Sequence, residues 1–518
     1  MRLYAPLAAV TLLCGCATLP QLEAAPAASG APVMPASSYT EQHRPAFHYS
    51  PPGGWMNDPN GLVYHEGEWH MFYQYYPHDT VWGPMHWAHA VSRDLVSWET
   101  LPIAIAPDEN GYIFSGSAVI DTNNSAGFGE KAMVAIYTIH DPVRGAANTR
   151  DHESQGIAVS FDDGRTFQRY AGNPVLPNPG QTQDFRDPNV FWDSARGHWV
   201  MSLSVTDHVR FYASDDLKDW TYLSSFGEGL AAQGVVWECP NLFPIVDQTS
   251  RETRWVLIQN LNPGGPQGGS GTRYFVGDWD GTRFTPDPHF GTQAVWLDHG
   301  ADNYAGITWD NAPDGRRVFI GWMSNWLYAQ TVPTQAWRSA MTVPRELSLH
   351  GLELRQEPVA ELQSLRGLPV DQMTQAGGGI ASWSGLATTA EYDLTFHLPQ
   401  ANSGFVLRLS NDAGEELELG LDAEGHWFVD RSDAGPAAFE PAFAARHTAP
   451  RLRGSGTARI RLLVDRASVE LFADDGATVL TESFFPTEDF TTTSLQLTGG
   501  AKLVGGTAWP LAPAKFTR

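Results

Sequence analysis

Asn57-Asp58-Pro59-Asn60-Gly61 stands shortly before the apolar run Trp69-His70-Met71-Phe72-Tyr73-Gln74-Tyr75, and this pairing decides the fold. The run is rich in aromatic residues and bounded by turn residues, so it predicts a β-strand. Four further polar starts precede comparable apolar runs: Phe114-Ser115-Gly116-Ser117, Arg186-Asp187-Pro188-Asn189, Glu238-Cys239-Pro240-Asn241 and Asp302-Asn303-Tyr304-Ala305. Measured between residues 58, 115, 187, 238 and 302, the spacings are 57, 72, 51 and 64 residues.

Five units of this length, each with room for four strands, predict a five-bladed β-propeller over residues 42–350. The innermost strand of each propeller blade lines the central axis. We therefore expect Asp58, Asp187 and Glu238 to meet at one end of that axis. A β-sandwich would explain the strands but not the recurrence of polar residues at their starts.

The pattern changes after residue 350. Residues 351–375 are interpreted as a linker, in which 357–366 form a short amphipathic helix with a proline near its start. Residues 376–518 alternate between apolar and polar residues in short runs separated by turns. This pattern predicts a β-sandwich, so the whole chain is expected to be all-β.

The N-terminus is typical of an export signal. Arg2 precedes an apolar stretch that is too short for a permanent membrane span. Residues 1–16 resemble a bacterial lipoprotein signal with Cys16 as the lipidated residue, and residues 17–41 a flexible linker. We expect a membrane-anchored lipoprotein of the periplasm, the outer membrane or the cell surface. The alternative is an ordinary signal and a secreted protein.

The formal net charge of −25 argues against nucleic acid as a partner, because proteins that bind phosphates collect Lys and Arg. A neutral substrate such as a sugar is compatible with this charge. The sequence gives no sign of an obligate protein partner, and the membrane is expected to be reached only through the lipid on Cys16.

Three carboxylates stand at the polar starts, each with a proline one or two residues later. Any one of them alone is better explained as a turn residue. On one propeller axis, however, two carboxylates that flank a glycosidic bond are the apparatus of glycoside hydrolysis. We expect Asp58 to stay ionised among hydrogen-bond donors, Glu238 to stay protonated beside Trp237 and Cys239, and Asp187 to stay charged beside Arg186.

Trp55-Met56-Asn57-Asp58-Pro59-Asn60-Gly61, Arg186-Asp187-Pro188 and Glu238-Cys239-Pro240, in this order, resemble the signature motifs of glycoside hydrolase family 32. The resemblance implies retaining hydrolysis with Asp58 as nucleophile, Glu238 as general acid/base and Asp187 as transition-state stabiliser. It implies no metal and no cofactor. It also implies that a fructosyl pocket is shaped by Asn57, Gln74, Trp82, Phe114, Ser115, Arg186 and Trp322.

The substrate is expected to be a fructan. Gly321-Trp322-Met323-Ser324-Asn325-Trp326 resembles levanases and exo-inulinases, and export suits a polymeric substrate. We therefore expect release of terminal fructose from levan or inulin, with sucrose as a second substrate. Two alternatives stay open: a fructosyltransferase that uses the same three carboxylates, and a non-catalytic surface lipoprotein that binds glycans.

Overall fold

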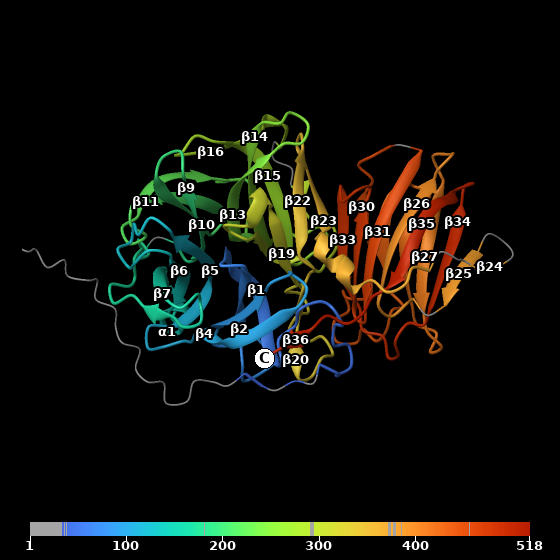
Figure 1. Ribbon diagram of the computed structural model, residues 1–518, viewed down its shortest axis with the longest axis horizontal. Helices are drawn as coiled ribbons and strands as arrows, with labels where there is room; N and C mark the ends of the chain where they lie inside the picture. The colour runs from blue at the N-terminus through green and yellow to red at the C-terminus, as the bar shows by residue number, and fades with distance from the viewer. Residues whose placement is uncertain are drawn as a thin grey trace, which may run out of the picture.

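The computed structural model describes residues 34, 35, 37, 39–180, 182–290, 295–370, 374–376, 380–384, 386–454 and 456–518. The expected signal segment, Cys16 and most of the 17–41 linker lie outside the described residues. Within these ranges the chain is almost entirely β-structure, with a propeller on one side and a sandwich on the other (Figure 1). No helix among the described residues is long and apolar enough to cross a membrane.

Five small antiparallel sheets follow one another along the chain and form the blades. The first contains β1 (Gly54–His65), β2 (Glu68–Tyr76), β3 (His86–Ser92) and β4 (Trp98–Ile105), and the second β5 (Tyr112–Asp121), β6 (Ala132–His140), β7 (Glu153–Ser160) and β8 (Gln168–Arg169). The third contains β9 (Phe185–Asp193), β10 (His198–Val205), β11 (His208–Ser214) and β12 (Thr221–Phe226). The fourth contains β13 (Val236–Val246), β14 (Thr253–Asn262), β15 (Gly271–Trp279), β16 (Phe284–Pro286) and β17 (Val295–Trp296). The fifth contains β18 (Tyr304–Thr308), β19 (Val318–Met323), β21 (Ala340–Met341), β22 (Arg345–His350) and β23 (Glu353–Pro358).

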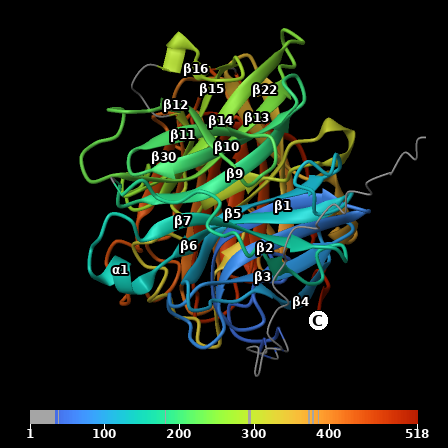
Figure 2. The same cartoon turned by 90° about the vertical axis from the view of Figure 1, so that its left-hand side faces the viewer.

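The first strand of each blade lies on the axis. β1 contacts β5, β5 contacts β9, β9 contacts β13, β13 contacts β18 and β18 contacts β1, so the five strands close a ring. Four of them, β1, β5, β9 and β13, are labelled in Figure 2. The helix α1 (Pro142–Ala146) and the 3-10 helices η1 (Pro288–Phe290) and η2 (Pro313–Gly315) lie in connections between strands. The predicted five-bladed propeller is confirmed.

Each innermost strand is irregular at its polar motif. The register shifts lie at residues 56–59 of β1, 114–116 of β5, 186–189 of β9, 238–241 of β13 and 304–307 of β18. Such bulges leave a residue out of the ladder and re-aim its side chain. They also explain the repeated acid-proline pairs, because proline has no N–H to donate and is tolerated in a sheet at bulges.

Two larger sheets form the C-terminal sandwich. One contains β24 (Thr374–Ala376), β25 (Ile380–Ser384), β34 (Thr492–Thr498), β27 (Gly404–Ser410), β28 (Glu416–Leu421), β29 (His426–Asp430) and β30 (Arg446–Pro450). The other contains β33 (Thr478–Ser483), β32 (Ser468–Ala473), β31 (Thr457–Asp465), β26 (Ala390–His397) and β35 (Lys502–Pro510). Alternate residues such as Leu417 and Leu419, and Ile460 and Leu462, fill the core between the sheets. The predicted sandwich is confirmed.

Two details differ from the sequence expectation. Residues 357 and 358 belong to β23, and a 3-10 helix, η3 (Ala360–Leu365), follows in place of a helix over 357–366. Its buried side chains are Leu362 and Leu365. The last strand, β36 (Phe516–Thr517), leaves the sandwich and pairs in parallel with β4, while β20 (Trp337–Arg338) pairs in parallel with β1. These additions cover both edges of the first blade, whose backbone groups would otherwise lack partners.

Buried ion pairs join the propeller to the sandwich. Arg345 binds Asp298 at 3.0 Å on the propeller side and Glu470 at 2.6 Å on the sandwich side. Arg431 of the sandwich binds Asp302 at 2.7 Å. All these side chains are at most 1% exposed. Because an unpaired buried charge is costly, these pairs fix how the two parts meet.

Candidate active site

One end of the propeller axis opens into a cavity of about 400 Å³. Asp58, Asp187 and Glu238 line it from β1, β9 and β13, as the repeat predicts. Six further predicted residues line the same cavity: Asn57, Gln74, Trp82, Phe114, Ser115 and Arg186. The bulges in the innermost strands bring these distant segments to one place.

Asp58 lies among hydrogen-bond donors. Its Oδ1 accepts a 3.0 Å bond from Asn57 Nδ2, and its Oδ2 accepts a 2.7 Å bond from Ser115 Oγ. The Cys239 thiol lies 3.6 Å from Oδ2. Burial and the nearby Glu238 nevertheless raise the pKa of Asp58, although these donors oppose the shift. These donors therefore favour the ionised form of Asp58, as expected, but they do not outweigh the effect of burial on its pKa.

Asp187 is held by backbone and thiol. The backbone of Asp187 has a φ of 63°, in the left-handed region. Its carboxylate lies next to the bulge of β13. The Cys239 N–H donates a 3.0 Å hydrogen bond to Asp187 Oδ2, and the Cys239 thiol lies 3.7 Å from it. Burial raises the pKa of Asp187 to about 8, and the charges of Glu238 and Asp58 add to this effect against the attraction of Arg186.

Arg186 forms ion pairs with three carboxylates, and Asp187, its neighbour in the sequence, is not one of them. It binds Asp184 at 2.6 Å, Glu153 at 3.2 Å and Glu238 at 3.1 Å. Among the described residues it forms no ion pair with Asp187. The attraction of Arg186 lowers the pKa of Asp187, as the sequence suggests, but burial outweighs it.

Glu238 does not have the apolar surroundings that the sequence suggests. One oxygen, Oε1, accepts hydrogen bonds from Nε and Nη2 of Arg186 at 3.3 and 3.1 Å. The other, Oε2, accepts a short hydrogen bond from the Tyr304 hydroxyl. Tyr304 comes from β18, so the fifth blade contributes a donor to the same site.

The aromatic wall differs from the prediction at one position. Trp82 is 38% exposed and contacts Phe114 edge-on with ring centroids 6.1 Å apart. Trp322 is fully buried behind the cavity, where it packs against Trp55 and Trp326. Trp326 lines the cavity in its place. Alternate residues of a strand point to opposite faces, so the tryptophan in β19 faces the core.

Five lining residues beyond Trp326 were not predicted: His140, His152, Glu153, Asp184 and Gln330. No repeated sequence motif marks these residues. Only the acids Glu153 and Asp184 could have been suspected, as partners for the charge of Arg186. His140 stacks on Phe114 at 4.3 Å between centroids and extends the wall.

His140, His152 and Glu153 also bring their ligand atoms within 4.8 Å of one another, close enough for one metal ion. Glu153 is already engaged, because its Oε2 accepts a 2.7 Å hydrogen bond from the Phe185 N–H and both its oxygens accept from Arg186. The guanidinium therefore occupies the side from which a cation would approach.

The family can now be named from comparison. Residues 48–358 match the model of the N-terminal domain of glycosyl hydrolases family 32, and residues 361–510 match that of its C-terminal domain. The chain belongs to glycosyl hydrolases family 32. This confirms the resemblance carried by the three carboxylate motifs.

Relatives within family 32 cover nearly the whole chain. A levanase of Bacillus subtilis (strain 168) is 44% identical over 92% of this chain and 71% of its own length. An extracellular exo-inulinase of Aspergillus niger is 40% identical over 90% of this chain and 94% of its own length. The crystal structure of an exo-inulinase from Aspergillus awamori superposes with a TM-score of 0.85 at 38% identity, covering 92% of this chain and 99% of that one.

Proposed function

We propose that this protein hydrolyses terminal β-fructosyl linkages of fructans with retention of configuration. Sucrose is proposed as a further substrate. The observation that carries the proposal is the meeting of Asp58, Asp187 and Glu238, from three blades, in one cavity. Family membership, and relatives named levanase and exo-inulinase, give the substrate class.

Asp58 is the proposed nucleophile. Its Oδ atom attacks the anomeric carbon of the terminal fructosyl unit, the glycosidic C–O bond breaks, and a fructosyl-Asp58 ester forms. The ester is then cleaved by water, which restores the carboxylate. The donors Asn57 and Ser115 orient the attacking oxygen through their hydrogen bonds of 3.0 and 2.7 Å.

Glu238 is the proposed general acid/base. It gives a proton to the departing oxygen in the first step and takes one from water in the second. Arg186 and Tyr304 hold its two oxygens in place.

Asp187 and Gln74 are proposed to hold the fructosyl unit. The Asp187 carboxyl hydrogen-bonds ring hydroxyls, and the positive charge that develops in the ring favours its ionised form and strengthens these bonds. Gln74 lines the cavity, and its buried Nε2 has no hydrogen-bond partner in the part of the chain that the structure describes. A buried donor of this kind gains most from a ligand oxygen.

Exo action is favoured by the closed base of the cavity. Below the carboxylates the axis narrows to a void of about 10 Å³ lined by Asp187, Cys239 and Ser115, among others. That volume is about enough for a single water. The cavity is therefore closed at its base, which suits a pocket that receives a chain end.

The roles are tested by azide rescue with the full chain and an aryl β-fructoside, whose leaving group needs no acid. Glu238→Ala is expected to regain turnover with azide and to give a fructosyl azide of retained configuration. Asp58→Ala is expected to give the inverted azide, because azide then replaces the nucleophile. Asp207→Asn, at a half-buried carboxylate that does not line the cavity, serves as the control and should match the wild type.

Products from levan, inulin and sucrose, separated by chromatography, test the substrate class. Steady release of fructose alone from one polymer supports exo-hydrolysis, and short oligosaccharides contradict it. Fructosyl transfer to sucrose at high concentration would favour the transferase, and no turnover of any of the three would favour a glycan-binding role.

We also propose that the protein is exported, since relatives such as the Aspergillus exo-inulinase are named extracellular. Anchoring through Cys16 is the more specific proposal, and it rests on the lipoprotein-like signal in residues 1–16. Mass spectrometry of the mature N-terminus tests it: an acylated Cys16 supports anchoring, and an unmodified N-terminus further along contradicts it.

A further inference from the structure

The other end of the propeller axis holds a second cavity, of about 530 Å³. In β5, β9 and β13 the residues that line it follow those that line the candidate active site, as in Ser117 after Ser115, Asn189 after Asp187, and Asn241 after Glu238. The second cavity therefore lies further along the same axis. The void of about 10 Å³ separates the two, so substrate in one cannot reach the other.

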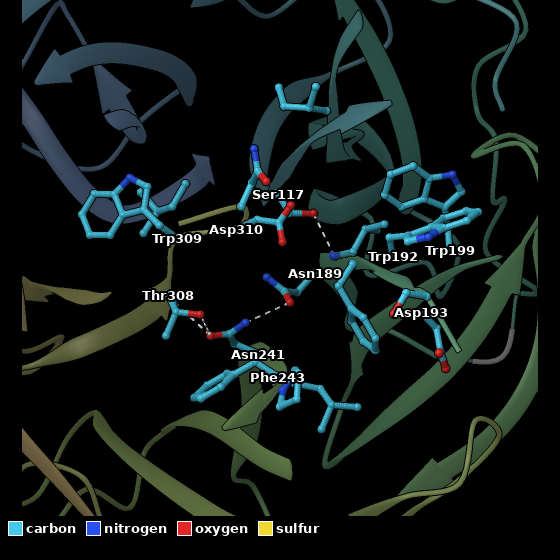
Figure 3. A pocket seen from close by; sticks show the side chains of 18 of the residues that line it. Ser117, Asn189, Trp192, Asp193, Trp199, Asn241, Phe243, Thr308, Trp309 and Asp310 are labelled. Carbon is cyan, nitrogen blue, oxygen red and sulfur yellow. Dashed lines mark hydrogen bonds between the residues drawn. The ribbon is translucent and has the colours of Figure 1, made fainter. Parts of the chain in front are cut away.

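A buried amide with a free donor lies at the base of this cavity. Asn189 is 8% exposed, and its Oδ1 accepts a 3.0 Å hydrogen bond from Asn241 Nδ2. Asn241 is itself fixed, because its Oδ1 accepts from Thr308 N–H and Oγ1 at 2.9 Å. This chain of hydrogen bonds sets the orientation of Asn189. Its Nδ2 points toward the middle of the cavity (Figure 3) and has no partner among the described residues.

A carboxylate and a guanidinium with unused hydrogen-bonding capacity complete the polar set. Burial raises the pKa of Asp310 to about 6, and no side chain of the described residues donates a hydrogen bond to it. Arg317 uses its Nε on the Pro244 carbonyl at 2.9 Å, and its terminal nitrogens have no acceptor among the described residues. Both residues line the cavity, but they form no ion pair with each other.

Aromatic rings form the rest of the wall. Trp192, Phe191 and Trp255 are half-buried and keep part of their surfaces open to the cavity. Phe191 and Trp255 pack together with centroids 5.5 Å apart, and Trp192 lies 5.0 Å from Trp199. These contacts fix the rings before any ligand binds, which lowers the entropic cost of binding.

We propose that this second cavity binds a neutral saccharide, at a site separate from the candidate active site. Sugar rings offer hydroxyls that both donate, as Asp310 requires, and accept, as Asn189 and Arg317 require. Their C–H faces pack against aromatic rings. The volume is within the usual range of small-molecule sites.

Other ligand classes fit less well. A phosphate would meet Arg317 but also the Asp310 carboxylate. Among the described residues that line the cavity, a metal ion would find only the Asp310 carboxylate outside an ion pair, because Asp193 is already bound to Arg196 at 3.1 Å and to Trp279 Nε1 at 3.2 Å. An apolar ligand would leave the donor of Asn189 and the charge of Asp310 unpaired.

A saccharide site in the second cavity would anchor a polymeric substrate to the protein. The choice of a fructan as the saccharide rests on the proposed function. A chain held at one end of the axis keeps other chain ends near the opposite mouth and raises their effective concentration. Short substrates such as sucrose would gain nothing from such an anchor.

The test uses the full chain with 5-fluorotryptophan in place of its 19 tryptophans and with Asp58→Ala to prevent turnover. Fluorine NMR resonances of Trp192 and Trp82 are assigned by Trp→Phe variants and followed during titration with an inulin-type trisaccharide. The Trp192 signal is expected to shift along a saturable curve, and Asp310→Asn to weaken this binding by about tenfold. Asp314→Asn, at an exposed acid in the same loop, is the matched control and should leave the curve unchanged.

The two resonances separate this inference from the proposed function. A shift of Trp192 without one of Trp82 would support the second site and contradict the proposed substrate. A shift of Trp82 with a fixed Trp192 signal would overturn the second site and leave the proposed function standing, as water alone then fills this cavity. As a second readout, Asp310→Asn is expected to reduce retention on insoluble levan while kcat/KM for sucrose stays within about twofold.

Discussion

The Cys239 N–H donates a 3.0 Å hydrogen bond to Oδ2 of Asp187, so the strand that carries Glu238 also holds the carboxylate of the neighbouring blade. The Cys239 thiol lies 3.6 Å from Asp58 Oδ2 and 3.7 Å from Asp187 Oδ2. One residue thus touches two of the three acidic groups. Cys239 has a left-handed φ of 44° within the bulge of β13, and such bulges re-aim the residues that they take out of the ladder.

Replacement of this thiol should shift the pH dependence of catalysis. The thiol donates to Asp58 and lowers its pKa, so Cys239→Ala removes a donor and the pKa of Asp58 rises. The acidic limb of kcat/KM is then expected to move to higher pH, while Cys239→Ser, which keeps a donor, moves it less. The check is the pH profile of kcat/KM for sucrose in the three proteins, and identical acidic limbs would refute the role of the thiol.

The sequence was sufficient to place the three carboxylates. A repeated acid-proline start predicted both the propeller and the meeting of Asp58, Asp187 and Glu238, because equivalent positions of a repeat occupy equivalent places around an axis. These predictions depend only on the order of strands and on which end of each strand faces the site. The resemblance to family 32 placed Trp82 at the cavity.

Charge states and strand faces could not be derived in this way. Arg186 was assigned to Asp187, its neighbour in the chain, but its partners Glu153 and Glu238 come from other blades. The pKa of Asp187 depends on how deeply the site is buried, which no local motif encodes. Trp322 was assigned to the pocket through the resemblance. Its direction depends on the pleat of β19, and a bulge or a shift by one residue reverses that direction.

The Arg186 bridge should be sensitive to the shape of its cation. Arg186→Lys keeps the charge, but one ammonium cannot reach Asp184, Glu153 and Glu238 together. We expect kcat/KM for sucrose to fall about 10²-fold, mainly through kcat, because Glu238 is then poorly positioned. Steady-state kinetics measure this, with Arg254→Lys at a surface ion pair as the control. A change in KM alone would show that Arg186 serves only substrate binding.

Asp187 should reduce stability at alkaline pH while it serves catalysis. Its folded pKa of about 8 is above the value of about 3.9 for an unfolded chain, so its stabilising contribution is complete below pH 4 and lost as the pH rises through 8. Asp187→Asn lacks this loss. At pH 8 the variant is expected to be more stable than the wild type by roughly 1–3 kcal/mol and about 10²–10³-fold less active.

Urea unfolding of both proteins from pH 4 to 8 measures this difference, and the gap should close toward pH 4. A variant that is less stable at pH 8 would show that the buried carboxylate is stabilising in its charged form. Such a result would mean that the hydrogen bonds and the attraction of Arg186 stabilise the charged Asp187 by more than its burial costs.

His48 provides the opposite kind of titration at the interface between propeller and sandwich. Its ring nitrogens lie 2.8 Å from Asp465 Oδ2 and 2.8 Å from Glu470 Oε1, and all three side chains are fully buried. Burial alone would lower the pKa of His48, but the hydrogen bonds to Asp465 and Glu470 outweigh it and raise the pKa to about 9. The stabilisation is therefore complete below about pH 6.5 and is lost as the pH rises through 9.

The shift from 6.5 to about 9 corresponds to about 3 kcal/mol between pH 6 and pH 10. His48→Gln cannot carry the charge, so its free energy of unfolding should be lower than that of the wild type at pH 6, and the difference should shrink by about this amount toward pH 10. Asp187 also titrates in this window, but it is present in both proteins and cancels in the difference. His426→Gln, at an exposed histidine of the sandwich, is the control and should follow the wild type. A constant gap across the whole range would mean that His48 is neutral in the folded protein and that Arg345 alone neutralises Glu470 at this interface.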